Sequence, residues 1–260
     1  MSFLQAFLFG WAGVALAMLA FWVLQLSRTN AGVVDVVWAY STALVAWWLI
    51  HSASDGDPWR HALLALMIGV WGVRLGTHLL IRLRDGIEDG RYVYFRKMLG
   101  DKLHPGMFAF FQVQALWVMI FVLPIWAAAQ SSRGPLDGLD VAGIVVWLIA
   151  ISGETIADRQ LASFKAVEAN RGKVCERGLW RYSRHPNYFF EWIHWLAYPL
   201  IGWGSWWWLT TLAGVIVMYV FLTRLTGIPF TEKQSLRTRG EAYEAYQRTT
   251  SVFFPMPPQS

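Results

Sequence analysis

The sequence predicts an all-α protein, a multi-pass integral membrane bundle of seven transmembrane helices with its N-terminus outside and its C-terminus in the cytoplasm. Apolar residues make up 56% of the 260 positions, whereas charged residues make up only 15%. This apolar share is close to what seven helices of about 21 residues need to cross a bilayer. The 17 Trp and 16 Phe residues agree, because aromatic rings favour membrane interfaces. The single cysteine excludes a disulfide framework and a thiolate metal cluster.

Seven apolar runs reach or approach the length needed to cross about 30 Å of hydrocarbon. In chain order they are 3–26, 33–52, 60–81, 107–129, 138–157, 187–203 and 206–226. The first has no basic n-region and no A-x-A-like cleavage site, so we expect it to stay in the protein rather than to be removed as a signal peptide. Only four residues separate the sixth run, which is the shortest, from the seventh. These two are therefore predicted to form a tight helical hairpin.

The basic residues predict the orientation of these helices. With the N-terminus outside, the odd-numbered loops and the C-terminal tail hold 19 of the 22 Lys and Arg residues. Arg60 and Arg133 lie on the outer side, and Arg74 is within a helix. This distribution is the one that the positive-inside rule predicts for seven spans. Both long loops, 82–106 and 158–186, then face the cytoplasm, where we expect an ordered functional site.

Ionisable side chains within membrane helices are costly and are therefore candidates for function. They occur in or at the ends of the second, third, fifth and sixth runs, mostly toward the cytoplasmic ends: Asp35, Arg74, Glu154, Asp158, Glu191 with the amide Asn187 one turn before it, and His194. We expect these four helices to converge on one polar pocket in the cytoplasmic half of the bundle. The alternative is structural: Asp35 and Asp158 cap or solvate helix ends, and Arg74 pairs with one of the carboxylates.

Several kinds of chemistry are not supported by the sequence. The six histidines are scattered on both sides of the membrane, so no metal site is expected. No G-x-S-x-G, G-x-G-x-x-G or P-loop motif is present. The basic cytoplasmic loops suit a polyanionic cofactor such as a dinucleotide with a diphosphate and a 2′-phosphate, because Arg binds phosphate oxygens bidentately. Membrane topology alone is the alternative explanation for these charges.

The run from Arg177 to Glu191, RGLWRYSRHPNYFFE, resembles the C-terminal catalytic domain of the steroid 5α-reductase family, in particular its bacterial membrane branch. The family pattern has a Gly-Leu-aromatic segment, a Tyr, and an Asn followed four residues later by Glu, here Gly178, Leu179, Trp180, Tyr182, Asn187 and Glu191. Flanking positions also match: Glu154, Asp158, Lys165, Tyr246 and Pro255. The resemblance covers about 150–256 and implies a single seven-helix membrane domain. Within it, 1–129 would lie mainly on the substrate side and 138–256 would bind NADPH.

The resemblance implies roles for individual residues. Asn187 would hydrogen-bond the nicotinamide carboxamide, and Glu191 would lie near the reacting ring. Further contacts to the cofactor are expected from Glu154, Asp158, Lys165, Arg181, Tyr182, Arg184, His185, Tyr246 and Arg91. In the N-terminal half, Asp35 matches the substrate-side carboxylate and Arg74 matches a basic position. Trp71 stands where the animal enzymes have a catalytic Tyr, so protonated Asp35, or a water that it holds, becomes the candidate acid.

The implied reaction is the NADPH-dependent reduction of an activated C=C bond in a 3-oxo-Δ4 steroid or a similar lipid enone. Hydride would reach the β carbon while the acid polarises the carbonyl. The expected partners are the enone substrate and membrane lipids, with no nucleic acid and no obligate protein partner. The expected location is the bacterial inner membrane, with the active site open to the cytoplasm.

A second family remains an alternative. Arg184-His185-Pro186-Asn187-Tyr188 is similar to a motif of the isoprenylcysteine carboxyl methyltransferases, membrane enzymes that use S-adenosylmethionine. The Glu- and Tyr-containing tail is similar as well. Those enzymes usually have Gly near position 190, where this chain has Phe190 followed by Glu191. Their methyl donor also lacks phosphates, so it would not use so many basic residues.

Overall fold

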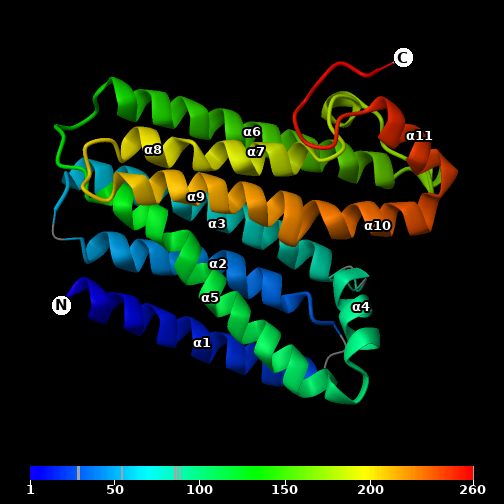
Figure 1. Cartoon of the computed structure of the whole chain (residues 1–260), viewed down its shortest axis with the longest axis horizontal. Helices are drawn as coiled ribbons and strands as arrows, with labels where there is room; N and C mark the ends of the chain where they lie inside the picture. The colour runs from blue at the N-terminus through cyan, green and yellow to red at the C-terminus, as the bar shows by residue number, and fades with distance from the viewer. Residues whose placement is uncertain (28–29, 54, 85, 87, 89, 260) are drawn as a thin grey trace. The chain divides into compact units, whose positions relative to one another are not determined.

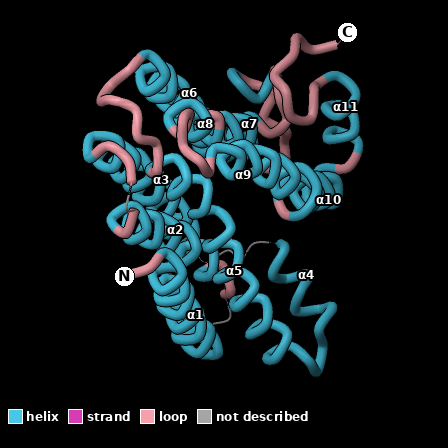
Figure 2. The backbone as a smooth tube through the Cα atoms, turned by 60° about the vertical axis from the view of Figure 1, so that its left-hand side comes forward, coloured by secondary structure: helices cyan, strands magenta, loops and turns pink. Residues whose placement is uncertain are grey.

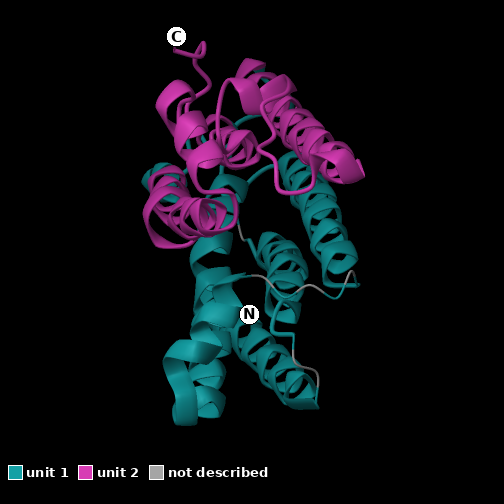
Figure 3. Ribbon diagram, turned by 90° about the vertical axis from the view of Figure 1, so that its right-hand side faces the viewer, with its two compact units in different colours: residues 1–137, 201–214 teal, residues 138–200, 215–260 magenta. Residues whose placement is uncertain are grey.

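A computed structural model describes residues 1–27, 30–53, 55–84, 86, 88 and 90–259. These residues form helices joined by loops, with no strand among them (Figure 2). The chain divides into two compact units, residues 1–137 with 201–214 and residues 138–200 with 215–260 (Figure 3). The predicted all-α class is confirmed for the described residues. The division between the units at Asp137 and Gly138 lies in the segment that joins the fourth and fifth apolar runs.

Unit 1 contains the first five helices of the chain (Figure 1), which are α1 (Phe3–Ser27), α2 (Val33–His51), α3 (Pro58–Arg84), α4 (Gly90–Leu99) and α5 (Leu103–Ala129). Helix α2 packs against α1, α3 and α5, and half of its apolar window is buried. Only 11% of the α1 window is buried. Apolar side chains of α1 therefore face outward, as expected for a helix that contacts lipid.

Glycines allow α3 to approach α2 closely. A Cβ added at Gly72 would lie 2.4 Å from the Ala43 Cβ, and one added at Gly76 would lie 2.6 Å from the Tyr40 ring. The two glycines are four residues apart and share one face of α3, the small-xxx-small pattern that lets membrane helices pack closely. The Tyr40 and Thr77 hydroxyls, 3.2 Å apart, add a hydrogen bond between the same helices.

The two outer basic residues predicted from the sequence both stabilise the segment after α5. The buried Arg60 donates hydrogen bonds to the carbonyls of Ser131, Arg133 and Gly134, at 2.9–3.1 Å. Arg133 donates to the Ile201 carbonyl at 2.8 Å and forms an ion pair with Asp137 at 2.6 Å. These guanidinium groups satisfy backbone carbonyls that would otherwise lack partners beyond the helix end.

Unit 2 begins with α6 (Gly138–Lys165), followed by two short 3₁₀ turns, Glu168–Asn170 and Gly178–Arg181. The chain then returns as α7 (Pro186–Trp195), beside α6 and antiparallel to it (Figure 1). A Cβ added at Gly153 of α6 would lie 2.4 Å from the Phe190 ring. The absence of a side chain at this position therefore allows α7 to lie directly against α6.

The later helices are α8 (Ala197–Ile201), α9 (Trp208–Val220), a π-helical turn (Phe221–Leu225), α10 (Gly227–Arg239) and α11 (Glu241–Thr249). The C-terminal segment then returns to the start of α7. The Arg184 amide donates to the Ser251 carbonyl at 2.8 Å, and the Met256 amide donates to the Tyr182 carbonyl at 2.9 Å. Aromatic rings from α7, α9 and this segment pack together: Phe189, Trp192, Tyr219, Phe253 and Phe254.

Six stretches of the described chain are long and apolar enough to cross a membrane: Phe3–Ser27, Val33–His51, Pro58–Arg84, Gly90–Ala129, Gly138–Lys165 and Trp208–Arg239. The predicted sixth run, 187–203, is instead divided between α7, with 10 residues, and α8, with 5. Pro199 has no N–H to donate, which weakens helical continuity there. The predicted hairpin turn is present, because Ile201 ends α8, Gly204 has φ of 82° and α9 begins at Trp208.

Both long loops contain helical structure. The segment 82–106 includes α4 and the 3₁₀ turn Gly100–Lys102, and the segment 158–186 includes the end of α6 with the two 3₁₀ turns. The prediction that these loops are ordered is therefore confirmed for their described residues. Polar and aromatic residues within them therefore lie on helices or helical turns, from which they can contribute to a site.

Candidate functional site

The candidate site of unit 2 lies where α6 and α7 pack together. The Asn187 side-chain amide donates a hydrogen bond to Asp158 at 3.2 Å. Pro186 occupies the first turn of α7, where a missing N–H is tolerated, and this places Asn187 at the start of the helix. An asparagine amide has two N–H donors and a carbonyl acceptor, and this contact uses one donor. Two residues that the sequence predicts separately as cofactor contacts are therefore brought together, and the Asn187 amide has further groups that can bind a ligand.

Two buried carboxylates lie one turn away from this pair. In antiparallel helices, the turn before Asp158 in α6 faces the turn after Asn187 in α7. These turns carry Glu154 and Glu191, which are 5% and 7% exposed. The Trp195 indole donates to Glu191 at 3.2 Å. The four predicted residues thus form one polar strip along the α6–α7 contact, which we call the α6–α7 strip.

Arg184 and His185, which the sequence predicts to contact a cofactor, bind a carboxylate of the same unit. The Arg184 guanidinium donates two hydrogen bonds to Glu232 of α10, at 3.0 and 3.1 Å, and His185 bonds it at 2.8 Å. Tyr243 donates to the same carboxylate at 2.8 Å, and Gln247 donates a further, short hydrogen bond. We call these five residues the Glu232 cluster. Their contacts connect the start of α7 to α10 and α11.

Electrostatic effects follow from the burial of this cluster. Burial lowers the pKa of His185, although the hydrogen bond to Glu232 opposes this shift. Burial raises the pKa of the Tyr243 phenol, and the negative charge of Glu232 raises it further. Tyr243 therefore keeps its proton and remains a hydrogen-bond donor at neutral pH.

Tyr246 and the 3₁₀ turn Gly178–Arg181 make hydrogen bonds that stabilise the fold of unit 2. The buried Tyr246 hydroxyl donates to the carbonyls of Trp180 and Ser183. The Trp180 indole donates to the Ala157 carbonyl of α6 at 2.9 Å. Burial raises the pKa of the Tyr246 phenol, so it stays protonated in this role. Trp180 thus attaches the 3₁₀ turn Gly178–Arg181 to α6.

The remaining predicted contacts of unit 2 do not belong to the α6–α7 strip. Arg181 and Tyr182 are exposed on the turn that precedes α7. Lys165 lines a separate pocket at the C-terminal end of α6. His194 bonds the Tyr198 hydroxyl at 2.7 Å, so the Glu191-x-x-His194 pair has partners other than a metal. Among the described residues, no group of three His, Cys, Asp or Glu side chains has the arrangement of a metal site.

The candidate site of unit 1 is built on Asp35, in the first turn of α2. Arg91 of α4 forms an ion pair with one carboxylate oxygen at 2.9 Å, and Tyr92 donates to the other at 2.7 Å. Tyr92 is fully buried. Both carboxylate oxygens of Asp35 therefore accept hydrogen bonds from side chains of α4. In this hydrogen bond the Tyr92 hydroxyl is the donor and Asp35 is the acceptor, so Tyr92 joins Asp35 as a candidate for the acid.

Trp71 and Arg74 lie on neighbouring turns of α3. The Trp71 ring is fully buried and meets Trp38 edge-on, with ring centroids 6.0 Å apart. Trp38 in turn meets Phe121 of α5 edge-on at 5.7 Å. Arg74 is half-buried on the following turn. Trp71 therefore forms part of the aromatic core of unit 1, a role that the sequence comparison with a catalytic Tyr did not indicate.

Among the four helices that the sequence predicts to converge, the structure describes two packed pairs. α2 packs with α3 inside unit 1, and α6 packs with α7 inside unit 2. Sequence reasoning did not assign a role to Tyr92 or Glu232. The aromatic content of the 82–106 loop was the signal for Tyr92, and the polar residues of the tail were the signal for Glu232.

The family profile described as "Protein of unknown function (DUF1295)" matches residues 21–250. An uncharacterized protein of Schizosaccharomyces pombe is 23% identical over 273 residues, which cover 90% of this chain and 75% of that protein. No solved structure matches the chain. The matched region contains the Asp35 site, the α6–α7 strip and Glu232.

Proposed function

Because this chain belongs to the DUF1295 family, which is defined without a known function, we propose an activity from the site itself. The protein is a membrane-embedded, NADPH-dependent reductase of an activated C=C bond in a 3-oxo-Δ4 steroid or similar lipid enone. The observation that carries the proposal is the Asn187–Asp158 pair, next to buried Glu191, within the motif that resembles the steroid 5α-reductases. Polar groups on membrane helices cost free energy, so a strip of them indicates a functional site.

The α6–α7 strip has the groups needed to hold a nicotinamide. A carboxamide has one acceptor and two donors, and Asn187 offers a complementary donor and acceptor. Asp158 fixes the orientation of the Asn187 amide by accepting one of its N–H groups. When bound, NADPH supplies the hydride that is added to the β carbon of the enone. Glu154 and Glu191 accept hydrogen bonds beside the ring in this assignment.

Carbonyl activation is assigned to unit 1. The reaction requires an acid that can donate a hydrogen bond to the substrate carbonyl. The buried Tyr92 hydroxyl, which donates to Asp35, is the group that we assign to this role. A hydrogen bond from this phenol to the substrate oxygen stabilises the enolate that forms as the β carbon is reduced. Asp35 and Arg91 orient the phenol. Tyr92 takes the role that the family gives to a Tyr at the position of Trp71.

The topology belongs to the same proposal. α7 and α8 together, as the sixth crossing, complete a seven-helix bundle whose N-terminus is outside the bacterial inner membrane. The positive-inside rule then places the C-terminus in the cytoplasm, because 19 of the 22 basic residues fall on that side. The site opens to the cytoplasm, where NADPH is available, and an apolar substrate enters from the lipid.

The test uses purified protein in lipid nanodiscs with a Δ4-3-ketosteroid, NADPH and detection of the reduced product by mass spectrometry. Asn187→Ala and Glu191→Gln are expected to lower turnover by at least about 100-fold while the thermal unfolding midpoint stays close to wild type. Glu241→Gln, which neutralises an exposed carboxylate of α11, is the matched control. Normal turnover in both site variants would show that the site is elsewhere.

The same preparation tests the methyltransferase alternative. Binding of S-adenosylmethionine without binding of NADPH would favour that class. The structure places two of the residues shared with that class, Arg184 and His185, in the Glu232 cluster. These contacts stabilise the start of α7 whichever cofactor binds, so ligand binding decides between the two proposals.

A further inference from the structure

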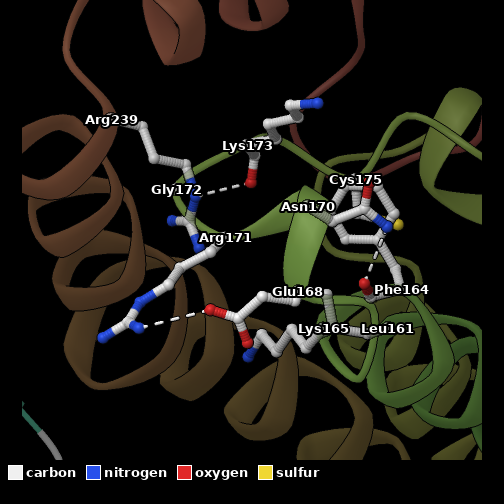
Figure 4. A pocket seen from close by; sticks show the side chains of 10 residues that line it. All are labelled: Leu161, Phe164, Lys165, Glu168, Asn170, Arg171, Gly172, Lys173, Cys175 and Arg239. Carbon is white, nitrogen blue, oxygen red and sulfur yellow. Dashed lines mark hydrogen bonds and ion pairs between the residues drawn. The ribbon is translucent and has the colours of Figure 1, made fainter.

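A basic pocket of about 370 Å³ lies at the C-terminal end of α6 in unit 2 (Figure 4). Its volume is in the range of small-ligand sites. Four cationic side chains and a single carboxylate, Glu168, line it; the cations are Lys165, Arg171, Lys173 and Arg239. Other basic residues of unit 2, such as Arg237 and Arg248, are exposed and are not part of this lining. Membrane topology alone therefore does not explain why four cations line one cavity.

Hydrogen bonds hold the walls of the pocket in place. Arg239 of α10 donates to the Lys173 carbonyl at 3.1 Å, and Asn170 donates to the Phe164 carbonyl at 2.9 Å (Figure 4). The Lys173 amide donates to the Asn170 carbonyl at 2.9 Å, which closes the turn after α6. The pocket is thus formed before any ligand binds, which lowers the entropic cost of binding.

The charges of the pocket favour an anion. Arg171 and Glu168 form an ion pair at 3.5 Å, but their side chains are 86% and 89% exposed. Exposed pairs of this kind contribute little to stability, so Arg171 is able to turn toward a ligand at small cost. Figure 4 shows Lys165 and Arg171 extending toward Glu168 from either side. Guanidinium and ammonium groups around one cavity match the oxygens of a phosphate.

The position of the pocket favours a soluble phosphate over a lipid headgroup. Lys165 follows Asp158 by seven residues, so it lies on the same face of α6 and about 10 Å further along the helix axis. The continuous apolar run of α6 ends at Ala157, and the last turns of the helix alternate polar residues with Leu161, Ala162 and Phe164. The pocket therefore lies beyond the continuous apolar run of α6, toward the C-terminal end of the helix from the α6–α7 strip.

We propose that this basic pocket binds a phosphate monoester, and that its occupant is the 2′-phosphate of NADPH. The inference rests on the proposed reductase function for the identity of the dinucleotide. The excess of positive charge suits a dianionic monoester better than the singly charged phosphates of a diphosphate bridge. Lys165 and Arg171 are then the residues that select NADPH over NADH.

Alkylation of Cys175, the only cysteine of the chain, reports on the pocket that it lines. Burial raises the pKa of its thiol, so alkylation at neutral pH is slow enough to follow by mass spectrometry. The protein is placed in phosphatidylcholine nanodiscs, and alkylation is timed with NADP⁺, NAD⁺ or inorganic phosphate. A fourth sample contains phosphatidic acid in the nanodisc. NADP⁺ is expected to slow alkylation at concentrations at least about tenfold below those of NAD⁺.

Variants identify the side chains responsible. Lys165→Gln combined with Arg171→Gln is expected to weaken NADP⁺ protection by about 100-fold and to leave NAD⁺ protection unchanged. Glu168→Gln is expected to strengthen NADP⁺ protection, because it removes the carboxylate that opposes the phosphate. Arg237→Gln removes an exposed cation of α10 outside the pocket, and it is the control that should change neither ligand.

The outcomes separate this inference from the proposed function. Enone reduction with an NADPH preference that survives in the double variant would overturn the pocket and leave the function in place. Protection by inorganic phosphate but by neither dinucleotide would support a phosphate site and contradict the reductase. Protection by phosphatidic acid at lower concentration than by NADP⁺ would overturn the assignment to a dinucleotide.

Discussion

Two carboxylates, one in each unit, are bound by a basic side chain and a tyrosine, but they differ in the number of hydrogen bonds that they accept. In unit 1, Asp35 accepts one from Arg91 and one from Tyr92. In unit 2, Glu232 accepts from every other member of its cluster: Arg184, His185, Tyr243 and Gln247. A carboxylate has about four lone-pair sites. Glu232 is therefore saturated by the protein, whereas Asp35 retains acceptor capacity.

This difference separates a structural carboxylate from one that is suited to chemistry. The donors to Glu232 come from α11 and from the residues before α7, so each bond restrains the fold of unit 2. The donors to Asp35 are neighbours on α4, and one of them is a buried phenol with a transferable proton. Loss of Glu232 should therefore affect stability most, and loss of the Asp35 partners should affect turnover most.

The largest expected effect is on the chemistry of unit 1. Tyr92→Phe removes the hydroxyl and keeps the ring, so turnover of the enone is expected to fall by about 100-fold or more. NADPH binding should stay at the wild-type level, because the variant does not change unit 2. Steady-state kinetics together with a dinucleotide binding assay measures both quantities. Tyr94→Phe, on an exposed tyrosine of the same helix, is the control.

A Tyr92→Phe protein with wild-type turnover would return Asp35 to the role of acid. In that case Asp35→Asn, which keeps the size of the side chain and removes the acid, would be expected to lower turnover by about 100-fold or more. This second variant keeps the comparison between the two carboxylates testable whichever group holds the proton.

The next effect is on the stability of unit 2. Glu232→Gln leaves Arg184 without its ionic partner in a position where the two side chains are 11% and 13% exposed. Breaking such a pair by changing one member costs several kcal/mol, so the thermal unfolding midpoint is expected to fall by about 10 °C. Asp35→Asn, whose pair with Arg91 is 18% and 25% exposed, should lower the midpoint by less than half as much. Equal shifts of the midpoint would contradict the assignment of Glu232 to stability and of Asp35 to chemistry.

The fold class and much of unit 2 could be predicted from the sequence. Hydrophobic runs and basic loops predicted helices whose cores lie within the observed α1, α2, α3, α5, α6 and α9. The i, i+4 spacing of Asn187 and Glu191, and of Glu154 and Asp158, predicted the faces that meet in the α6–α7 strip. These features are local, because helical periodicity decides which residues share a face.

Features that depend on distant contacts could not be predicted. Arg184 and Arg181 are three residues apart in the same basic segment, but only Arg184 reaches Glu232, 48 positions later in the chain. The sequence likewise placed Tyr92 in a loop, and only the packing of α4 beside Asp35 gives it a partner. Charge pattern shows where a cation is present, and only the fold shows which carboxylate it binds.

The smallest expected effect is a pH dependence of the thermal unfolding midpoint that arises from His185 of the Glu232 cluster. Burial lowers the pKa of His185 in the folded chain, whereas the unfolded chain keeps the ordinary value of about 6.5. Below that pH the unfolded state binds more protons, so acidification favours unfolding. The loss is at most about 1.4 kcal/mol per pH unit. It should appear as a steeper fall of the thermal midpoint between pH 7 and pH 5 in the wild type than in His185→Gln.

The comparison with His185→Gln cancels the contributions of the other titrating groups, which both proteins share. Two charged groups face the imidazole: Glu232, which favours its protonation, and Arg184, which disfavours it. If the wild type gains stability relative to the variant on acidification, the charge of Glu232 outweighs burial and His185 is an imidazolium in the folded protein. The saturated carboxylate of unit 2 would then be neutralised by two cations, a stronger contrast with Asp35 and its single guanidinium.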